Sequence, residues 1–254
     1  MHSLFHHDAS RPAPSVEPVP TVFPSIAGAD IAAVFVGKRV AGDFYDSIRV
    51  SPERILFGLL DVAGRREENR GILSAAQQIF RTLGPELFSR PELNESDAMT
   101  ELSLRINRGL IDTSTGVHPC PAFIACYHEG FGTLCYTNAG HTSGLLRDST
   151  GTVELPSTGL PLGLFSHATS DAPTIGMEKG AALLLVSRGV VEFGDHPQKS
   201  GEEFGLKRIM EILQTLPACG AQELCVSIMD AVDAFVAGSQ VYNDRTALAL
   251  IRTA

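Results

Sequence analysis

Four aspartates stand beside short apolar runs, where strands are expected to begin or end: Asp43, Asp46, Asp61 and Asp244. Asp61 directly follows the apolar run 55–60, and Asp244 lies in segment 243–250, where a polar turn leads into another apolar run. Carboxylate oxygens are the ligands that hard divalent cations prefer. Carboxylates from separate strand ends therefore suit a cation site, although a single acid in a loop more often caps a turn.

The elements that would position these acids can be read from hydrophobic periodicity. Short apolar runs bounded by turn residues predict strands over 31–36, 55–62, 121–127, 132–138 and 182–187. Apolar residues at helical spacing predict helices over 72–83, over 99–110 behind a Ser96 cap, and over 202–216 and 221–236. Grouped helices between hairpin-like strands favour an α+β fold with antiparallel sheets over regular βαβ alternation.

Length and composition predict one large domain preceded by a tail. The chain has 254 residues, of which 44% are hydrophobic, enough to bury a full core. Residues 1–24 carry five prolines and few large apolar side chains, which predicts a flexible tail before a domain over 25–254. The net charge of −9 disfavours binding to nucleic acid or to an anionic membrane.

Cysteine usage and hydropathy predict a cytoplasmic protein. The five cysteines contain no CxxC pair, so the pattern indicates buried thiols in a reducing compartment rather than a disulfide framework. The N-terminus has no secretion signal, and no stretch is long and apolar enough to span a membrane.

Six short blocks in a fixed order resemble the PPM-type metal-dependent serine/threonine phosphatases, specifically the SpoIIE branch. The blocks are AGDFYD (41–46), LDVAGRR (60–66), NAGH (138–141), LPLG (160–163), SRG (187–189) and NDRT (243–246). The resemblance covers about residues 26–253. It implies a PP2C-like, four-layer α-β-β-α sandwich of two antiparallel sheets flanked by helices.

The resemblance also implies a site for two Mn²⁺ or Mg²⁺ ions. Asp61, the residue expected to be central to catalysis, would bridge both ions, and the Val62 carbonyl would lie beside it. Asp43 would bind one ion and Asp244 the other. Two such ions activate water and neutralise phosphate oxygens in phosphomonoester hydrolysis. Asp46 is not assigned as a ligand.

Arg188 stands where the resembled family has a further acid. The exchange changes the local charge by two units, and a unit charge pair about 4 Å apart is worth roughly 4 kcal/mol at an effective dielectric of about 20. Three arrangements are open: Arg188 pairs with Asp244 or Asp61 and replaces one metal, swings outward from a weakened site, or binds substrate phosphate beside a single metal.

A second departure follows Asp61, where the family's Gly-His-Gly becomes Gly64-Arg65-Arg66. Arg65 and Arg66 could bind phosphate, although mixed charges ahead of a helix more often form a solvated first turn. His141 in the NAGH block is expected to be a hydrogen-bonded structural residue rather than an acid or base.

Two functions follow from the resemblance. The first is a PPM-type phosphatase that hydrolyses phosphoserine or phosphothreonine on a regulatory partner protein, as in bacterial sigma-factor control. The alternative is a weak or inactive pseudophosphatase that acts as a binding module, which Arg188 favours. The chain contains no GxSxG, GxxxxGK or HExxH motif of unrelated enzyme classes.

Overall fold

The computed structural model describes seven stretches of this chain. They are residues 18–37, 42–62, 66–90, 92–114, 116–192, 203–236 and 243–254, of which residues 66–68 are described by their backbone alone.

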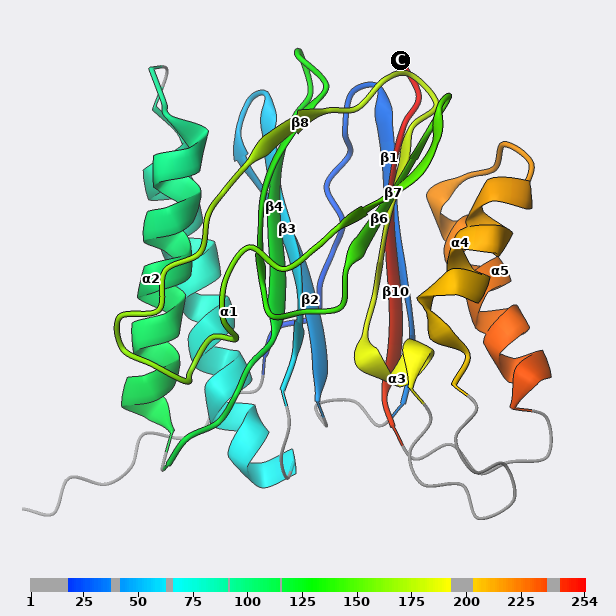
Figure 1. Cartoon of the computed structure of the whole chain (residues 1–254). Coiled ribbons are helices and arrows are strands. Elements are labelled where there is room, and N and C mark those ends of the chain that lie inside the picture. Colours follow the sequence, from blue (N-terminus) through cyan, green and yellow to red (C-terminus); the bar gives the residue numbers. More distant parts are fainter. Residues whose placement is uncertain are drawn as a thin grey trace, which may run out of the picture.

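Two five-stranded antiparallel sheets form the centre of the fold (Figure 1). One sheet has the order β1-β10-β9-β6-β7, with strands Ala29–Val36, Arg245–Arg252, Ala182–Val186, Gly144–Asp148 and Gly151–Leu155. The other has the order β2-β3-β4-β5-β8, with strands Asp43–Ser51, Arg54–Asp61, Ala122–His128, Thr133–Ala139 and Thr174–Gly176.

Helices cover the outer face of each sheet, which gives four layers (Figure 1). The sheet that contains β2, β3, β4, β5 and β8 is covered by α1 (Arg66–Phe88) and α2 (Glu95–Thr113). The sheet that contains β1, β10, β9, β6 and β7 is covered by α4 (Gly205–Thr215) and α5 (Ala221–Phe235). The short helix α3 (Arg188–Val191) follows β9. The predicted α-β-β-α sandwich is confirmed.

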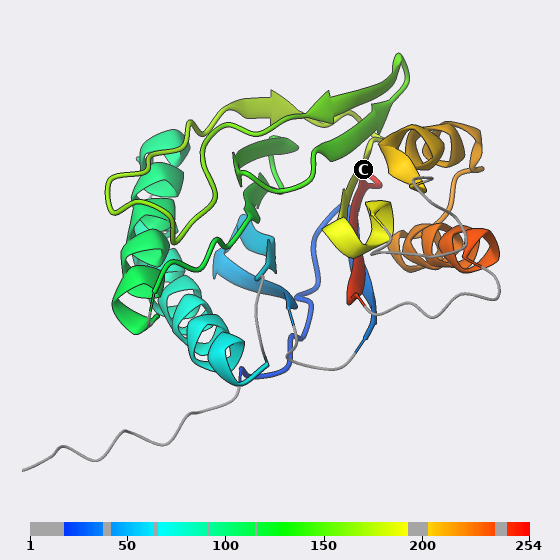
Figure 2. The same ribbon diagram turned by 60° about the horizontal axis from the view of Figure 1, so that its bottom comes forward.

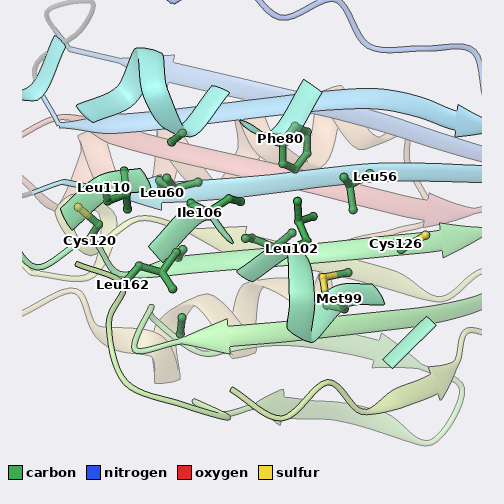
Figure 3. Packing of buried hydrophobic residues seen from close by; sticks show 14 of the residues in the cluster. Leu56, Leu60, Phe80, Met99, Leu102, Ile106, Leu110, Cys120, Cys126 and Leu162 are labelled. Carbon is green, nitrogen blue, oxygen red and sulfur yellow. The ribbon is translucent and has the colours of Figure 1, made fainter. Parts of the chain in front are cut away.

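Strand β3 shows how the layers are held together. Its odd-numbered residues Ile55, Phe57 and Leu59 are fully buried between the two sheets. Its even-numbered residues Leu56 and Leu60 face the helices, because successive side chains of a strand point to opposite faces. Figure 3 shows them packed with residues of α1 and α2, among them Phe80, Met99, Leu102 and Ile106.

The structure differs from the sequence expectations in several elements. The N-cap of α2 is Asn94, whose side chain accepts a hydrogen bond from the Asp97 N–H, whereas the Ser96 hydroxyl donates to the Ala172 carbonyl. Strands β2, β6, β7 and β8 and helix α3 were not predicted. Within the described ranges, every helix is too short or too polar to span a bilayer.

Residues 18–24, which the sequence assigns to the tail, lie against the domain. The Val19 N–H donates to Gln77 Oε1 at 2.7 Å, and the Gln77 amide donates back to the Val19 carbonyl at 2.8 Å. The ring of Phe23 stacks on Tyr45 with centroids 5.9 Å apart. Residues 1–17 lie outside the described ranges, so the domain boundary stays a prediction.

Candidate functional site

Asp43 and Asp61 face each other at the open end of the β2–β3 hairpin. Asp43 is the first residue of β2, Asp61 is the last residue of β3, and the two are paired in the antiparallel register. Directly opposed residues of an antiparallel pair project from the same face of the sheet, so both carboxyl groups lie on one side. The Asp61 N–H donates to the Pro121 carbonyl at 2.9 Å, which fixes this strand end.

Asp244 approaches these acids from the other sheet. It directly precedes β10, and Figure 2 brings forward the end of the sandwich where β10 begins and α3 lies. Its carboxylate fits against two glycines: a Cβ at Gly37 would stand 2.1 Å from Asp244 Oδ1, and one at Gly42 would stand 3.9 Å from Oδ2. Only glycine at position 37 leaves room for this carboxylate.

Two hydroxyl side chains hold Asp43: that of Thr246 in β10 and that of Ser187, which directly follows β9. The Thr246 hydroxyl donates to Asp43 Oδ2 at 2.8 Å, and the Ser187 side chain is also hydrogen-bonded to Asp43. The Thr246 N–H in turn donates to Ser187 Oγ at 3.0 Å. Neither residue was assigned a role from sequence, although both fall inside the blocks 187–189 and 243–246 that carry the resemblance.

The carboxyl group of Asp43 is buried among other acids, with only 8% of the residue exposed. Its pKa is raised from 3.8 to about 7, chiefly by burial and further by the negative charges of Asp61 and Asp244, while the hydrogen bonds from Ser187 and Thr246 oppose the rise. The hydrogen bonds from Ser187 and Thr246 therefore offset only part of the cost of ionising Asp43 in this site.

Two further groups near Asp61 are held by internal hydrogen bonds. The Val62 carbonyl accepts a hydrogen bond from the buried Asn69 amide at 3.1 Å, and the Val62 N–H donates to the Gly42 carbonyl at 3.0 Å. His141 is buried, and its Nδ1 lies 3.1 Å from the Thr142 carbonyl oxygen. Burial lowers the pKa of His141, against the opposing effects of Thr142 and Asp61, so a neutral structural imidazole fits this position.

Arg188 begins α3 and lies beside Asp61. Its Nε is 3.9 Å from Asp61 Oδ2 and also 3.9 Å from Glu192 Oε2, and 57% of its side chain is exposed. Of the three arrangements that the sequence allows for Arg188, the observed geometry is closest to an ion pair with Asp61. The distance between Nε and Oδ2 nevertheless exceeds that of a hydrogen bond.

Asp46 lies away from this site in a separate buried ion pair. Its carboxylate accepts two hydrogen bonds from Arg81, at 2.7 and 2.9 Å. Further hydrogen bonds reach it from the Gln77 amide, the Thr21 hydroxyl and the Ser47 N–H. Asp46 thus joins β2 to α1 and to residues 18–24, and does not cap a turn in isolation.

The sequence candidates Asp43, Asp61, Val62, Asp244 and Arg188 therefore meet at one end of the sandwich. Arg65 lies outside the described residues, as does the side chain of Arg66, so their phosphate-binding role stays a prediction. Within the described ranges, no three His, Cys, Asp or Glu side chains are already arranged at the spacing of metal ligands. The acids are close enough to influence one another, but they are not a preassembled cage.

Comparisons with known proteins agree with this architecture. Residues 51–254 match the family model described as Stage II sporulation protein E (SpoIIE). Phosphoserine phosphatase RsbP of Bacillus subtilis (strain 168) is 28% identical over 159 residues, which cover 61% of this chain and 38% of RsbP. The match thus spans well under half of that relative.

Two solved structures share the fold. The RsbU and RsbW domains of Rv1364c from Mycobacterium tuberculosis superpose with a TM-score of 0.72 and 21% identity, over 91% of this chain and 63% of that one. The PP2C phosphatase domain of SpoIIE from Bacillus subtilis, with a fragment of its regulatory domain, gives a TM-score of 0.71 and 13% identity, over 89% and 62% of the two chains.

Proposed function

This chain belongs to the SpoIIE family of PPM-type, PP2C-like phosphatase domains, and on that premise we propose that it hydrolyses phosphoserine or phosphothreonine on a regulatory partner protein in bacterial signalling. The observation that carries the proposal is the convergence of Asp43, Asp61 and Asp244 from both sheets at one end of the sandwich. The relative RsbP is named as a phosphoserine phosphatase, which supports phosphoserine in this proposal. Partners in sigma-factor control belong to this proposal.

The acids of the site fit one divalent cation in chemistry and charge. Their oxygens are the donors that Mn²⁺ and Mg²⁺ take. The raised pKa of Asp43, caused by burial and by neighbouring carboxylates, is the electrostatic condition that a bound cation would relieve. Asp43, Asp61 and Asp244 would hold this ion, with the Val62 carbonyl beside them.

A second cation does not fit the residues present. The position of the further acid is occupied by Arg188, whose positive charge lies 3.9 Å from Asp61. We therefore expect one cation rather than the pair that the resemblance implies.

The protein's own groups would orient the reaction. A divalent cation bound by these acids would supply Lewis acidity toward phosphate oxygens and a nucleophilic water near neutral pH. Thr246 and Ser187 hold the carboxyl group of Asp43 in one orientation. The pairing of β2 with β3 keeps Asp61 opposite Asp43. Such positioning lowers the cost of bringing the reacting groups together.

A second candidate function is a pseudophosphatase that binds the same partner without hydrolysis. It is favoured by Arg188, whose permanent positive charge lies beside Asp61 at the position where the resembled family has an acid. Under this alternative, the ion pair replaces the cation and the sandwich serves as a recognition module. The two candidates differ in metal dependence, which makes them separable.

The test is hydrolysis of p-nitrophenyl phosphate with and without Mn²⁺ by wild type, Asp61→Asn and Arg188→Asp. We expect metal-dependent turnover by wild type that Asp61→Asn reduces to background. An inert wild type that Arg188→Asp activates would identify a pseudophosphatase disabled at one position. A parallel thermal-shift titration should show stabilisation of wild type by Mn²⁺, because a ligand that binds only the folded state raises stability.

A further inference from the structure

Arg188 projects from a backbone that is held firmly beside Asp244. The Ser187 N–H donates to the Thr246 carbonyl at 2.9 Å, and the Thr246 N–H donates to Ser187 Oγ at 3.0 Å. The next residue, Gly189, packs so closely that an added Cβ would stand 2.0 Å from the Asp244 carbonyl oxygen. The base of the Arg188 side chain is therefore fixed at the edge of the candidate site.

The guanidinium itself is held only loosely. Its two acidic neighbours, Asp61 and Glu192, are each 3.9 Å from Nε, beyond the range of a hydrogen bond. Within the described part of the chain, no hydrogen bond to the Arg188 side chain is formed. Ion pairs of an exposed side chain at such distances contribute little to stability. Little free energy is therefore needed to turn the guanidinium toward an incoming ligand.

An anion that enters this acidic site needs a positively charged group beside it. Asp43 and Asp61 are paired across β2 and β3, and Asp244 lies against Gly37 and Gly42, so the three carboxyl groups would repel a phosphate group. A guanidinium stays protonated and presents paired N–H donors that match two phosphate oxygens. Among the described residues that form this site, Arg188 is the one that carries a positive charge.

We propose that Arg188 is a phosphate-binding residue, which grips the phosphoryl group of the substrate beside the acids and supplies positive charge at the position where relatives have a metal-binding acid. The identity of the ligand rests on the proposed function, but the binding itself requires no hydrolysis. In this arrangement the ion pair with Asp61 is the resting state, and the phosphoryl group displaces it.

The experiment is isothermal titration calorimetry with inorganic phosphate, first in EDTA and then with Mn²⁺, on the full chain. The variants are Arg188→Ala, Arg188→Lys and the control Arg105→Ala. Arg105 matches Arg188 in exposure, 56% against 57%, and in having an acidic partner four residues away on its helix, but it lies on α2. Each variant is first checked for an unchanged melting temperature, and Arg188→Lys keeps the charge if Arg188→Ala fails to fold.

We expect Arg188→Ala to weaken phosphate binding by roughly tenfold or more, since a bidentate charge-assisted contact is lost. Arg188→Lys should recover part of the affinity, and Arg105→Ala should bind as wild type does. Equal affinity of wild type and both Arg188 variants would overturn the proposal, as would a wild type that binds no phosphate in either buffer.

The same variants separate this proposal from the proposed function. A wild type that binds phosphate through Arg188 but never hydrolyses p-nitrophenyl phosphate would support the role of Arg188 and refute the phosphatase. Metal-dependent turnover with an unchanged KM in Arg188→Ala would do the reverse. If the chain is a phosphatase and Arg188 binds the phosphoryl group, Arg188→Ala should raise KM more than it lowers kcat.

Discussion

At Asp43 the fold keeps a carboxyl group in surroundings that oppose its ionisation. The pKa is about 7 in the folded chain against an ordinary value of 3.8, chiefly because the group is buried. Between these values the folded chain holds a proton that the unfolded chain has lost. The free energy of unfolding therefore falls as pH rises from about 4 to about 7.

Asp43→Asn should remove this conflict. The amide is nearly isosteric, carries no charge, and its oxygen can still accept from the Thr246 hydroxyl. We expect the metal-free variant to be more stable than wild type at pH 8, by at most about 4 kcal/mol, with a much smaller gain at pH 4. Urea unfolding at the two pH values measures the difference.

Metal addition provides the contrast for this prediction. Mn²⁺ should stabilise wild type but not Asp43→Asn, because a neutral amide is a weaker ligand than a carboxylate. If Asp43→Asn were less stable than wild type at both pH values without metal, the carboxyl group would not be under the strain inferred from its surroundings.

Among the elements, the turn from β9 into α3 sets the position of both Asp244 and Arg188. Gly189, the second residue of α3, lies against the Asp244 carbonyl, while Ser187 is hydrogen-bonded to the Thr246 backbone of β10. These contacts depend on the close approach of two backbone segments. A side chain at position 189 would push β10 and α3 apart.

Gly189→Ala should consequently destabilise the fold and displace Asp244. The added Cβ would meet the Asp244 carbonyl oxygen at 2.0 Å, and such overpacking costs about 1–3 kcal/mol. The control is Gly176→Ala in the edge strand β8, where a Cβ has no neighbour within 4 Å. Thermal melting of the two variants tests this, and equal melting temperatures would show that the turn can relax.

For the molecule as a whole, the candidate site lies where the two sheets meet. Asp43 and Asp61 come from one sheet, and Asp244, Ser187 and Thr246 belong to the strands and turns of the other. A hydrogen bond such as that from Thr246 to Asp43 thus links residues from both sheets.

Residues 18–24 extend this packing to the beginning of the described chain. Residues 18–21 line a cavity of about 300 Å³ together with Asp43, Phe44 and Tyr45. The Thr21 hydroxyl reaches the Tyr45 carbonyl at 2.7 Å and Asp46 at 3.0 Å. The segment thus lies between α1 and the strand that carries Asp43.

Deletion of residues 1–24 should therefore lower stability, whereas deletion of residues 1–17 leaves every contact described above in place. Loss of the hydrogen bonds of Val19 and Thr21 should cost about 1–3 kcal/mol, with roughly 2–4 °C in melting temperature for each kcal/mol. Differential scanning calorimetry of the two truncations makes the comparison. Equal melting temperatures would indicate that residues 18–24 belong to the flexible tail that the composition predicts.

The sequence by itself determined the main strands and helices, the order of the layers through the family resemblance, and the replacement of an acid by Arg188. Those features depend on local periodicity and on short blocks of residues. Only the tertiary structure decided that Asp46 turns to Arg81 instead of the site, and that Ser187 and Thr246 hold Asp43. Thr246 and Asp43 are 203 positions apart, so their contact exists only once two sheets have packed face to face.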